Sequence, residues 1–140
     1  MTDATLLLGT NLGDRNRNIA TALSLLEEAL GGPCEHISPI IETQACGFEG
    51  PAFLNCAAVW KTDLPAEELL DVCKAVERRM GRRDLPEFAP DRSRIYHDRI
   101  IDIDILLYGG LEISSPRLTI PHPQIQSRPF VKELLQALER

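Results

Sequence analysis

The chain has 140 residues, of which 44% are apolar and 26% are charged, and its formal net charge at pH 7 is −6. This length and composition predict a single folded domain over residues 1–140 and exclude a disordered chain. Without a long apolar run or a charged leader before an apolar stretch, the chain is expected to be cytoplasmic and not membrane-bound. The acidic balance argues against nucleic-acid binding, which needs a basic face.

The first half of the chain predicts a strand, a helix and two further strands. Residues 4–9 form a short apolar run typical of a buried strand. From Ile19 to Leu30 the apolar residues fall at helical spacing, and Gly31 ends that helix. Residues 35–43 and 53–61 are expected to be the second and third strands.

The second half predicts a second helix, from Pro65 to Gly81, a long polar loop over 82–98 and a strand over 100–108. Gly109 and Gly110 are expected to turn the chain back as a hairpin into 111–113, and a last helix to cover about 130–139. The order β-α-β-β-α-β is typical of the ferredoxin-like split βαβ fold of the α+β class, here with an added hairpin and a C-terminal helix. Its antiparallel sheet would carry helices on one face and leave the other for loops and a ligand.

Positive charge is concentrated in one segment of this acidic chain. Residues 78–99 contain seven arginines and four acidic residues, so the segment carries +3 and the remainder −9. An arginine cluster of this kind favours a small, highly anionic ligand such as a polyphosphate. The alternative is a solvated helix end and loop.

Asp102 and Asp104 are the strongest local signal of chemistry. Because strand side chains alternate, both carboxylates should point to one face of the sheet, with their Cα atoms about 6.5 to 7 Å apart. Two like charges on one face repel each other, and magnesium, which shares carboxylates with substrate phosphates, is the natural compensation. With the arginines upstream, the pattern favours a nucleotide-phosphate site over an exposed acidic strand.

Two further groups of residues are open to more than one interpretation. His122 stands between two prolines, with Arg128 six residues later, and both could contact phosphate, although a structural loop histidine has the same pattern. Phe53 and Asn55 share a strand face, and with Phe130 they could hold a flat heterocycle by stacking and amide hydrogen bonds. The alternative is that both phenylalanines belong to the core.

Taken together and in this order, these motifs resemble those of the 6-hydroxymethyl-7,8-dihydropterin pyrophosphokinase family of folate biosynthesis. The resemblance runs from Gly9 to about Phe130. It rests on the segments Gly9-Thr10-Asn11-Leu12-Gly13-Asp14, Phe53-Leu54-Asn55-Cys56-Ala57, Glu77 with Gly81-Arg82, Arg99-Ile100-Ile101-Asp102-Ile103-Asp104-Ile105, and Leu118-Thr119-Ile120-Pro121-His122-Pro123 with Arg128.

The resemblance implies transfer of pyrophosphate from ATP to the pterin hydroxymethyl oxygen, with release of AMP. It implies that Asp102 and Asp104 bind two Mg²⁺ ions and that Arg82 and Arg99 are catalytic residues on the phosphates. The further ATP-binding positions that it implies are Glu77, Ile105, His122 and Arg128. The pterin-binding positions are Thr43, Cys46, Phe53, Asn55 and Phe130.

The same resemblance implies a mobile loop over 82–98 that closes on ATP and carries Arg82. No side chain stands out as a general base. The expected partners are small molecules, ATP and the pterin, and the expected state is a monomer. Two alternatives remain open at this point: another magnesium-dependent phosphotransferase or phosphohydrolase, and a non-catalytic ferredoxin-like module that binds a ligand.

Overall fold

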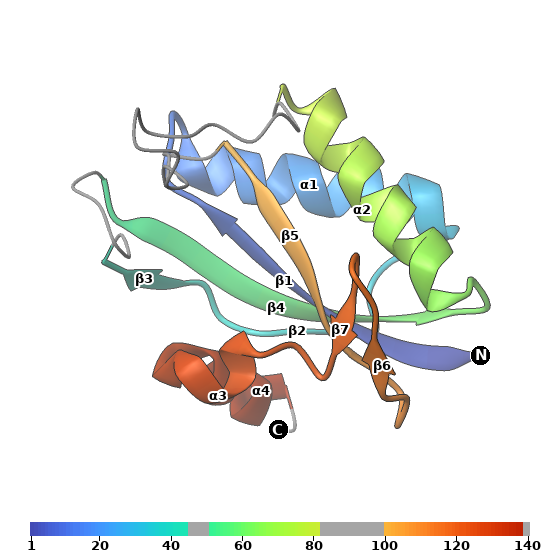
Figure 1. Ribbon diagram of the computed structural model, residues 1–140. Helices are drawn as coiled ribbons and strands as arrows, with labels where there is room; N and C mark the ends of the chain where they lie inside the picture. The colour runs from blue at the N-terminus through green and yellow to red at the C-terminus, as the bar shows by residue number, and fades with distance from the viewer. Residues whose placement is uncertain (45–50, 82–99, 139–140) are drawn as a thin grey trace, which may run out of the picture.

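One antiparallel sheet forms the centre of the molecule. The computed structural model describes residues 1–44, 51–81 and 100–138. The strands are β1 (Thr2–Thr10), β2 (His36–Ile37), β3 (Ile41–Thr43), β4 (Phe53–Thr62) and β5 (Asp102–Tyr108). In the sheet the strand order is β2-β4-β1-β5, and β3 also pairs with β4 (Figure 1). This architecture confirms the predicted α+β, ferredoxin-like fold.

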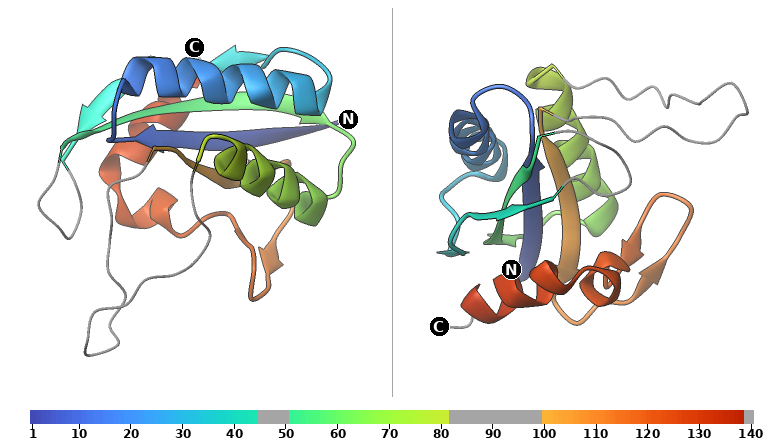
Figure 2. Two further views of the ribbon diagram at one scale, coloured as in Figure 1. Left: turned by 90° about the horizontal axis from the view of Figure 1, so that it is seen from above. Right: turned by 90° about the vertical axis from the view of Figure 1, so that its left-hand side faces the viewer.

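Two long helices, α1 (Arg15–Leu30) and α2 (Ala66–Arg79), cover one face of this sheet (Figures 1 and 2). Helix α1 begins after Asp14, whose side chain accepts a hydrogen bond from the backbone N–H of Arg17, as a capping aspartate does. It ends at Gly31, which has a φ of 83° and therefore takes the left-handed conformation that glycine adopts most readily. Both helix ends thus follow from local sequence.

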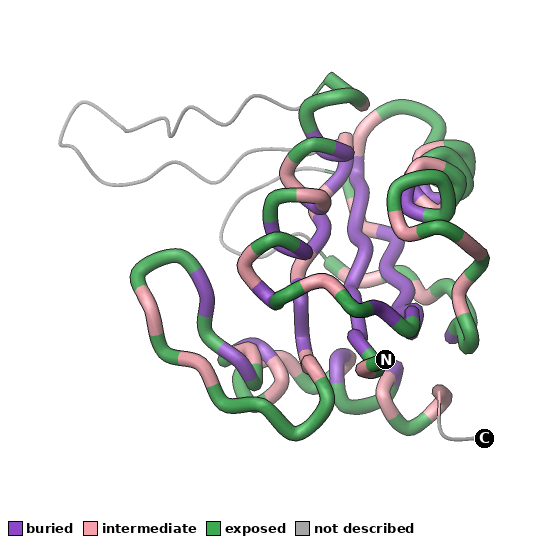
Figure 3. Tube along the Cα trace, turned by 90° about the vertical axis from the view of Figure 1, so that its right-hand side faces the viewer, coloured by how far each residue is buried: buried purple, intermediate pink, exposed green. Residues whose placement is uncertain are grey.

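The main core lies between the sheet and these two helices. Figure 3 shows the central strands buried along most of their length. Ile101, Ile103 and Ile105 are 0%, 2% and 1% exposed and pack into this core, as the alternation of strand side chains predicted. Cys56 and Cys73 are buried there too.

The expected single strand over 35–43 is wrong, because it is broken into β2 and β3. Pro39 has no backbone N–H to donate and lies at the break. There the Ser38 hydroxyl accepts the hydrogen bond of the Ala57 N–H, at 2.9 Å. The pairing with β4 then resumes one residue out of step, with Ile41 opposite Asn55 and Thr43 opposite Phe53. This shift places Thr43, and not Glu42, on the same face as Asn55.

The fold has an added hairpin, but its expected position at Gly109 and Gly110 is wrong. Its strands are β6 (Ile113–Ser114) and β7 (Thr119–Ile120), which pair with each other, and β6 does not pair with β5. Two backbone groups of β5 are already occupied, since Ile103 N–H donates to Glu77 and Leu106 C=O accepts from His122 N–H. The segment after Gly110 forms its hairpin with residues 119–120 and not with β5.

The second face of the sheet is partly covered, which corrects the expectation that it is left to loops and a ligand. The short helix α3 (Gln124–Ser127) and helix α4 (Pro129–Leu138) lie on this face (Figure 2). Val131 and Leu134 of α4 form a second apolar cluster with Leu7, Ala57 and Leu106. Within the described ranges, no helix combines the length and apolar character that crossing a membrane requires.

Candidate active site

The register of strands β4, β1 and β5 brings the two halves of the predicted site together. Gly9 of β1 pairs with Asn55 of β4 on one side and with Asp102 of β5 on the other. One row further along, Leu7 pairs with Ala57 and Asp104. Because neighbours in a row share a face, the predicted pterin residue Asn55 and the predicted metal ligand Asp102 lie on the same side, with only a glycine between them.

Because Gly9 has no side chain, the space between the Asn55 and Asp102 side chains stays open. A Cβ atom built on Gly9 would lie 3.1 Å from Asn55 Oδ1 and 3.7 Å from the ring of Phe53. These contacts show that the missing side chain would point into the predicted pterin side of the site. In the sequence, Gly9 is only the last residue of an expected strand and the first residue of a family segment, and its place between Asn55 and Asp102 becomes visible only with the strand register.

The negatively charged form of Asp104 is unfavourable in the free protein. Its burial, followed by the negative charge of Asp102, raises the pKa of the Asp104 carboxyl from its ordinary 3.8 to about 7. A hydrogen bond that Gln124 Nε2 donates to Asp104 Oδ2, at 2.9 Å, opposes this shift. A divalent cation between the two carboxylates would remove the remaining cost.

The donor set fits magnesium that is shared with a substrate. In the part of the chain that the structure describes, no group of three or more His, Cys, Asp or Glu side chains could hold a metal ion alone. Asp102 and Asp104 supply the one or two carboxylates that Mg²⁺ usually takes from protein, with substrate phosphates and water completing its octahedron. These two residues are therefore suited to a metal that arrives with a phosphate ligand.

A β-bulge in β5 brings His122 beside Asp104. Leu6 pairs with Ile105 and Thr5 with Leu107, so Leu106 is an extra residue in the ladder. Its carbonyl oxygen accepts a hydrogen bond of 3.0 Å from the backbone N–H of His122. The imidazole Nε2 then lies 4.0 Å from Asp104 Oδ1.

The His122 ring has one nitrogen committed to the backbone. Nδ1 accepts a hydrogen bond of 3.2 Å from the backbone N–H of Gln124, so in the neutral ring the proton is on Nε2. Burial lowers the pKa of His122, and the negative charge of Asp102 opposes this shift. The free N–H donor therefore points toward the side of the site that carries Asp104.

Arg128 is held between an amide and an aromatic ring. Its Nη1 donates to Gln124 Oε1 at 3.2 Å, and its guanidinium carbon lies 4.6 Å from the centre of the Phe130 ring. This stacking is the geometry of a cation–π contact. Arg128 and Phe130, predicted for ATP and pterin respectively, are therefore neighbours. Gln124, which the sequence analysis missed, links them to Asp104.

The structure places Glu77 and Ile105 on the other side of β5 from the two aspartates. The Glu77 side chain is fully buried, and its Oε2 accepts a hydrogen bond of 2.8 Å from the Ile103 N–H. Lys74 Nζ lies 3.7 Å from the other carboxylate oxygen. The Ile105 side chain is in the main core, so a contact of this residue with ATP has to come from its backbone.

The predicted pterin residues of β3 and β4 are adjacent. Asn55 is 3% exposed, and its Nδ2 donates a hydrogen bond of 2.8 Å to Thr43 Oγ1. Phe53 is two residues from Asn55 on the same face and pairs with Thr43. From α4, Phe130 packs against the second apolar cluster on that face. Cys46, Arg82 and Arg99 lie outside the described residues, as does the loop 82–98.

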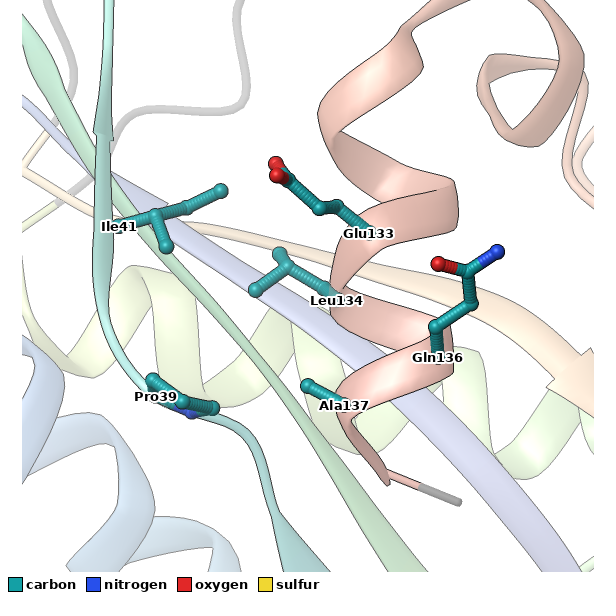
Figure 4. A pocket seen from close by; sticks show the side chains of 6 residues that line it. All are labelled: Pro39, Ile41, Glu133, Leu134, Gln136 and Ala137. Carbon is teal, nitrogen blue, oxygen red and sulfur yellow. The ribbon is translucent and has the colours of Figure 1, made fainter. Parts of the chain in front are cut away.

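A separate pocket lies between α4 and the chain from Pro39 to Ile41, where β3 begins. Figure 4 shows its lining, to which Pro39 and Ile41 contribute from one side and Glu133, Leu134, Gln136 and Ala137 from the other. None of the predicted site residues lines this pocket. The candidate site is therefore the row of side chains on the sheet face itself, and not this pocket.

Comparison with known proteins identifies the family of the chain. Residues 5–140 match the sequence model of the 7,8-dihydro-6-hydroxymethylpterin-pyrophosphokinase family. The chain is 39% identical over 129 residues to a 2-amino-4-hydroxy-6-hydroxymethyldihydropteridine pyrophosphokinase of Porphyromonas gingivalis, which covers 91% of this chain and 84% of that protein. It is 41% identical over 124 residues to the pyrophosphokinase of the same name from Aquifex aeolicus, covering 88% of this chain and 71% of that protein.

A longer relative carries the same unit. The mitochondrial folate synthesis bifunctional protein of Arabidopsis thaliana is 39% identical over 131 residues, which are 92% of this chain and 22% of that protein. The family that the motifs predicted is thereby confirmed, together with its general use of ATP and magnesium. The chain belongs to the 7,8-dihydro-6-hydroxymethylpterin-pyrophosphokinase family.

Proposed function

We propose that the chain transfers the pyrophosphoryl group of ATP to the hydroxymethyl oxygen of 6-hydroxymethyl-7,8-dihydropterin, a step of folate biosynthesis. The observation that carries this proposal is the row Asn55–Gly9–Asp102, in which an amide suited to a heterocycle and a carboxylate suited to a metal ion lie two strands apart on one face. A small alcohol substrate held at Asn55 would have its hydroxyl directed toward phosphates held at Asp102.

In the reaction, a bond forms between the hydroxymethyl oxygen and the β-phosphorus of ATP. The bond from the β-phosphorus to the oxygen that bridges it to the α-phosphorus breaks, AMP leaves with that oxygen, and the hydroxyl proton is released. Because the nucleophile is an alcohol and charge spreads over phosphate oxygens, alignment and charge neutralisation are the main requirements. No described side chain is assigned as a general base.

Asp102 and Asp104 are proposed to hold Mg²⁺, and two ions are expected. When bound, magnesium supplies positive charge that neutralises and orients the phosphate oxygens. The two aspartates are suited to this role because their own repulsion is relieved by a cation, as the raised pKa of Asp104 indicates. His122 Nε2 and the Arg128 guanidinium are proposed to donate to phosphate oxygens beside them.

Arg82 and Arg99 are proposed as the catalytic arginines on the phosphates, from the resemblance of their motifs. Glu77 of α2 and Ile105 of β5 are proposed to act at the nucleotide, and Glu77 would do so through its hydrogen bond to β5. At the other end of the row, Asn55 and Thr43 would bind the polar edge of the pterin. Phe53 and Phe130 would stack on its ring, and Cys46 is proposed as a further pterin-binding residue from the resemblance alone.

The domain organisation, the oligomeric state and the compartment of the protein are proposed from the sequence. We expect residues 1–140 to act as one domain, the protein to be a monomer and its compartment to be the cytoplasm. Gel filtration with light scattering at two protein concentrations checks the monomer directly. A mass near twice that of the chain at both concentrations would contradict it.

Product identification tests the proposed reaction. The chain is incubated with ATP and the hydroxymethyl-dihydropterin, with Mg²⁺ or with EDTA, and nucleotides are separated by chromatography. We expect AMP and pterin diphosphate in equal amounts, only with Mg²⁺ and only with the pterin present. Formation of ADP, or release of phosphate at the same rate without the pterin, would point to a different phosphotransferase or a hydrolase. Asp102→Asn and Asp104→Asn are expected to abolish AMP formation without loss of the fold.

A further inference from the structure

Gln124 makes more contacts with the proposed nucleotide site than any of its neighbours in α3. Only 8% of the residue is exposed. Its side-chain Nε2 donates to Asp104 Oδ2 at 2.9 Å, and its Oε1 accepts from Arg128 Nη1 at 3.2 Å. Its backbone N–H donates to His122 Nδ1 at 3.2 Å, and its backbone carbonyl accepts from the Arg128 N–H at 3.0 Å. Each of its four polar groups is thus bonded to a residue of the proposed site.

We infer that Gln124 is a positioning residue of this site, whose neutral amide holds the Asp104 carboxylate and the Arg128 guanidinium in place and apart from each other. The inference rests on the proposed function, which gives Asp104 and Arg128 their roles. Gln124 itself would touch neither the phosphates nor the pterin.

The two ends of an amide match the two charges that flank it. The NH₂ group is a donor only and faces the carboxylate, while the carbonyl oxygen is an acceptor only and faces the guanidinium. A carboxylate at this position would present oxygen to the oxygen of Asp104. An ammonium group would present N–H donors to those of Arg128. Of the side chains of this length, glutamine alone can satisfy both neighbours.

Keeping the two charges apart leaves both of them available for ligands. A carboxylate and a guanidinium on one face readily form a two-point ion pair. Such a pair would occupy the Asp104 oxygens that a cation needs and the Arg128 N–H groups that a phosphate needs. With Gln124 between them, Asp104 Oδ1 stays toward His122 at 4.0 Å, and Arg128 lies over the Phe130 ring at 4.6 Å.

The test replaces the amide by a side chain of similar length and leaves the neighbours unchanged. Gln124→Met removes the donor and the acceptor. Gln126→Met is the matched control, because Gln126 is an exposed glutamine in the same short helix. Gln124→Asn keeps the amide but shortens it by one methylene, so it cannot retain both hydrogen bonds at their present lengths. This third variant carries the test if Gln124→Met does not fold.

The affinity for a metal–nucleotide complex is the direct readout. Protein is titrated into Mn²⁺ bound to an ATP analogue with a methylene group between the α- and β-phosphorus atoms, and binding is followed by water-proton relaxation. We expect Gln124→Met to weaken binding about tenfold and Gln124→Asn at least threefold. Gln126→Met should bind as the wild type does.

Two further readouts separate positioning from a general loss of structure. The thermal midpoint of Gln124→Met should stay within about 3 °C of that of Gln126→Met. In turnover, KM for ATP should rise while KM for the pterin stays within twofold. Equal loss of both substrates, or the same loss in Gln126→Met, would overturn the inference.

Failure of the inference is distinguishable from failure of the proposed function. If wild-type protein binds the Mn²⁺–analogue complex and forms AMP, while Gln124→Met does both equally well, only the role of Gln124 is wrong. If wild-type protein neither binds that complex nor forms AMP, the proposed function itself is wrong, and the inference is overturned with it.

Discussion

The backbone N–H of Ile103 donates a hydrogen bond of 2.8 Å to the fully buried carboxylate of Glu77. Ile103 lies between Asp102 and Asp104 on β5, which is an edge strand of the sheet. An edge strand presents backbone groups that no neighbouring strand pairs. Glu77, from helix α2, satisfies one of these groups at the place where the two predicted metal ligands need a fixed backbone.

Replacing Glu77 by Ala is therefore expected to destabilise the protein. The Ile103 N–H would lose its acceptor inside the core, which costs roughly 1–3 kcal/mol. Chemical denaturation, compared with Glu68→Ala on the exposed side of the same helix, measures the difference. A Glu77→Ala variant as stable as the Glu68→Ala variant would contradict the structural role of this carboxylate.

Gly9→Ala is expected to weaken pterin binding while the protein still folds. The new methyl group would lie 3.1 Å from Asn55 Oδ1, so the amide has to move from the position it now takes. Overpacking of this kind costs about 1–3 kcal/mol. A cost of this size in pterin binding corresponds to a loss of affinity of about fivefold to 150-fold. Calorimetry with the pterin, at saturating Mg²⁺ and methylene-bridged ATP analogue, makes the measurement.

Gly110→Ala is the control for this change, because a Cβ on Gly110 meets nothing within 4 Å. It should bind the pterin as the wild type does. If Gly9→Ala also binds as tightly as the wild type, Gly9 does not border the pterin.

Asn55→Ala is expected to weaken pterin binding far more than ATP binding. The buried amide donates a hydrogen bond to Thr43 in the free protein. It can both donate hydrogen bonds to a heterocyclic edge and accept them from it. Leaving that edge unpaired costs roughly 1–3 kcal/mol. Separate titrations with the ATP analogue and with the pterin, alongside the exposed Asn16→Ala, check the difference. Similar losses for both ligands would remove Asn55 from the pterin side.

The predictable part of the fold is the part fixed by local pattern. The strands over 4–9, 53–61 and 100–108 and the two long helices follow from apolar spacing, a capping Asp14 and a terminal Gly31. The pairing of the two aspartates on one face also follows from alternation alone. These features depend on residues that are close together in the sequence, so the sequence reveals them directly.

The rest depends on contacts between distant residues. The break at Pro39 was visible as a proline, but the one-residue shift that it permits is decided by β4. The bulge at Leu106, which brings His122 to Asp104, depends on the ladder with β1. Gln124 follows His122 and Pro123 without any local mark of its role. Only the folded chain brings it between Asp104 and Arg128.

The raised pKa of Asp104 predicts a pH dependence of stability in the absence of metal. The folded-state pKa is about 7, above the ordinary value of 3.8, so between these values the folded state binds more protons than the unfolded state. Stability therefore falls as the pH rises through this window. Asp104→Asn removes this effect and keeps an oxygen to accept the Gln124 hydrogen bond.

Denaturation in EDTA at pH 5 and pH 8 measures this effect. The free energy of unfolding of Asp104→Asn is compared with that of the wild type at each pH. We expect this difference to shift in favour of the variant by roughly 1–2 kcal/mol from pH 5 to pH 8. Adding Mg²⁺ and the ATP analogue should reverse the order at pH 8, since only the wild type binds both. The same wild-type-to-variant difference at both pH values would contradict an Asp104 carboxyl that titrates near 7.

The most direct test of the shared site is a crystal structure of the wild-type chain with Mg²⁺, the methylene-bridged ATP analogue and the pterin. We expect metal bound by Asp102 and Asp104, and the pterin edge on Asn55. We also expect the pterin ring between Phe53 and Phe130, with the hydroxymethyl oxygen facing the β-phosphorus across Gly9. A metal held away from both aspartates, or a pterin in the pocket lined by Pro39 and Ala137, would contradict it.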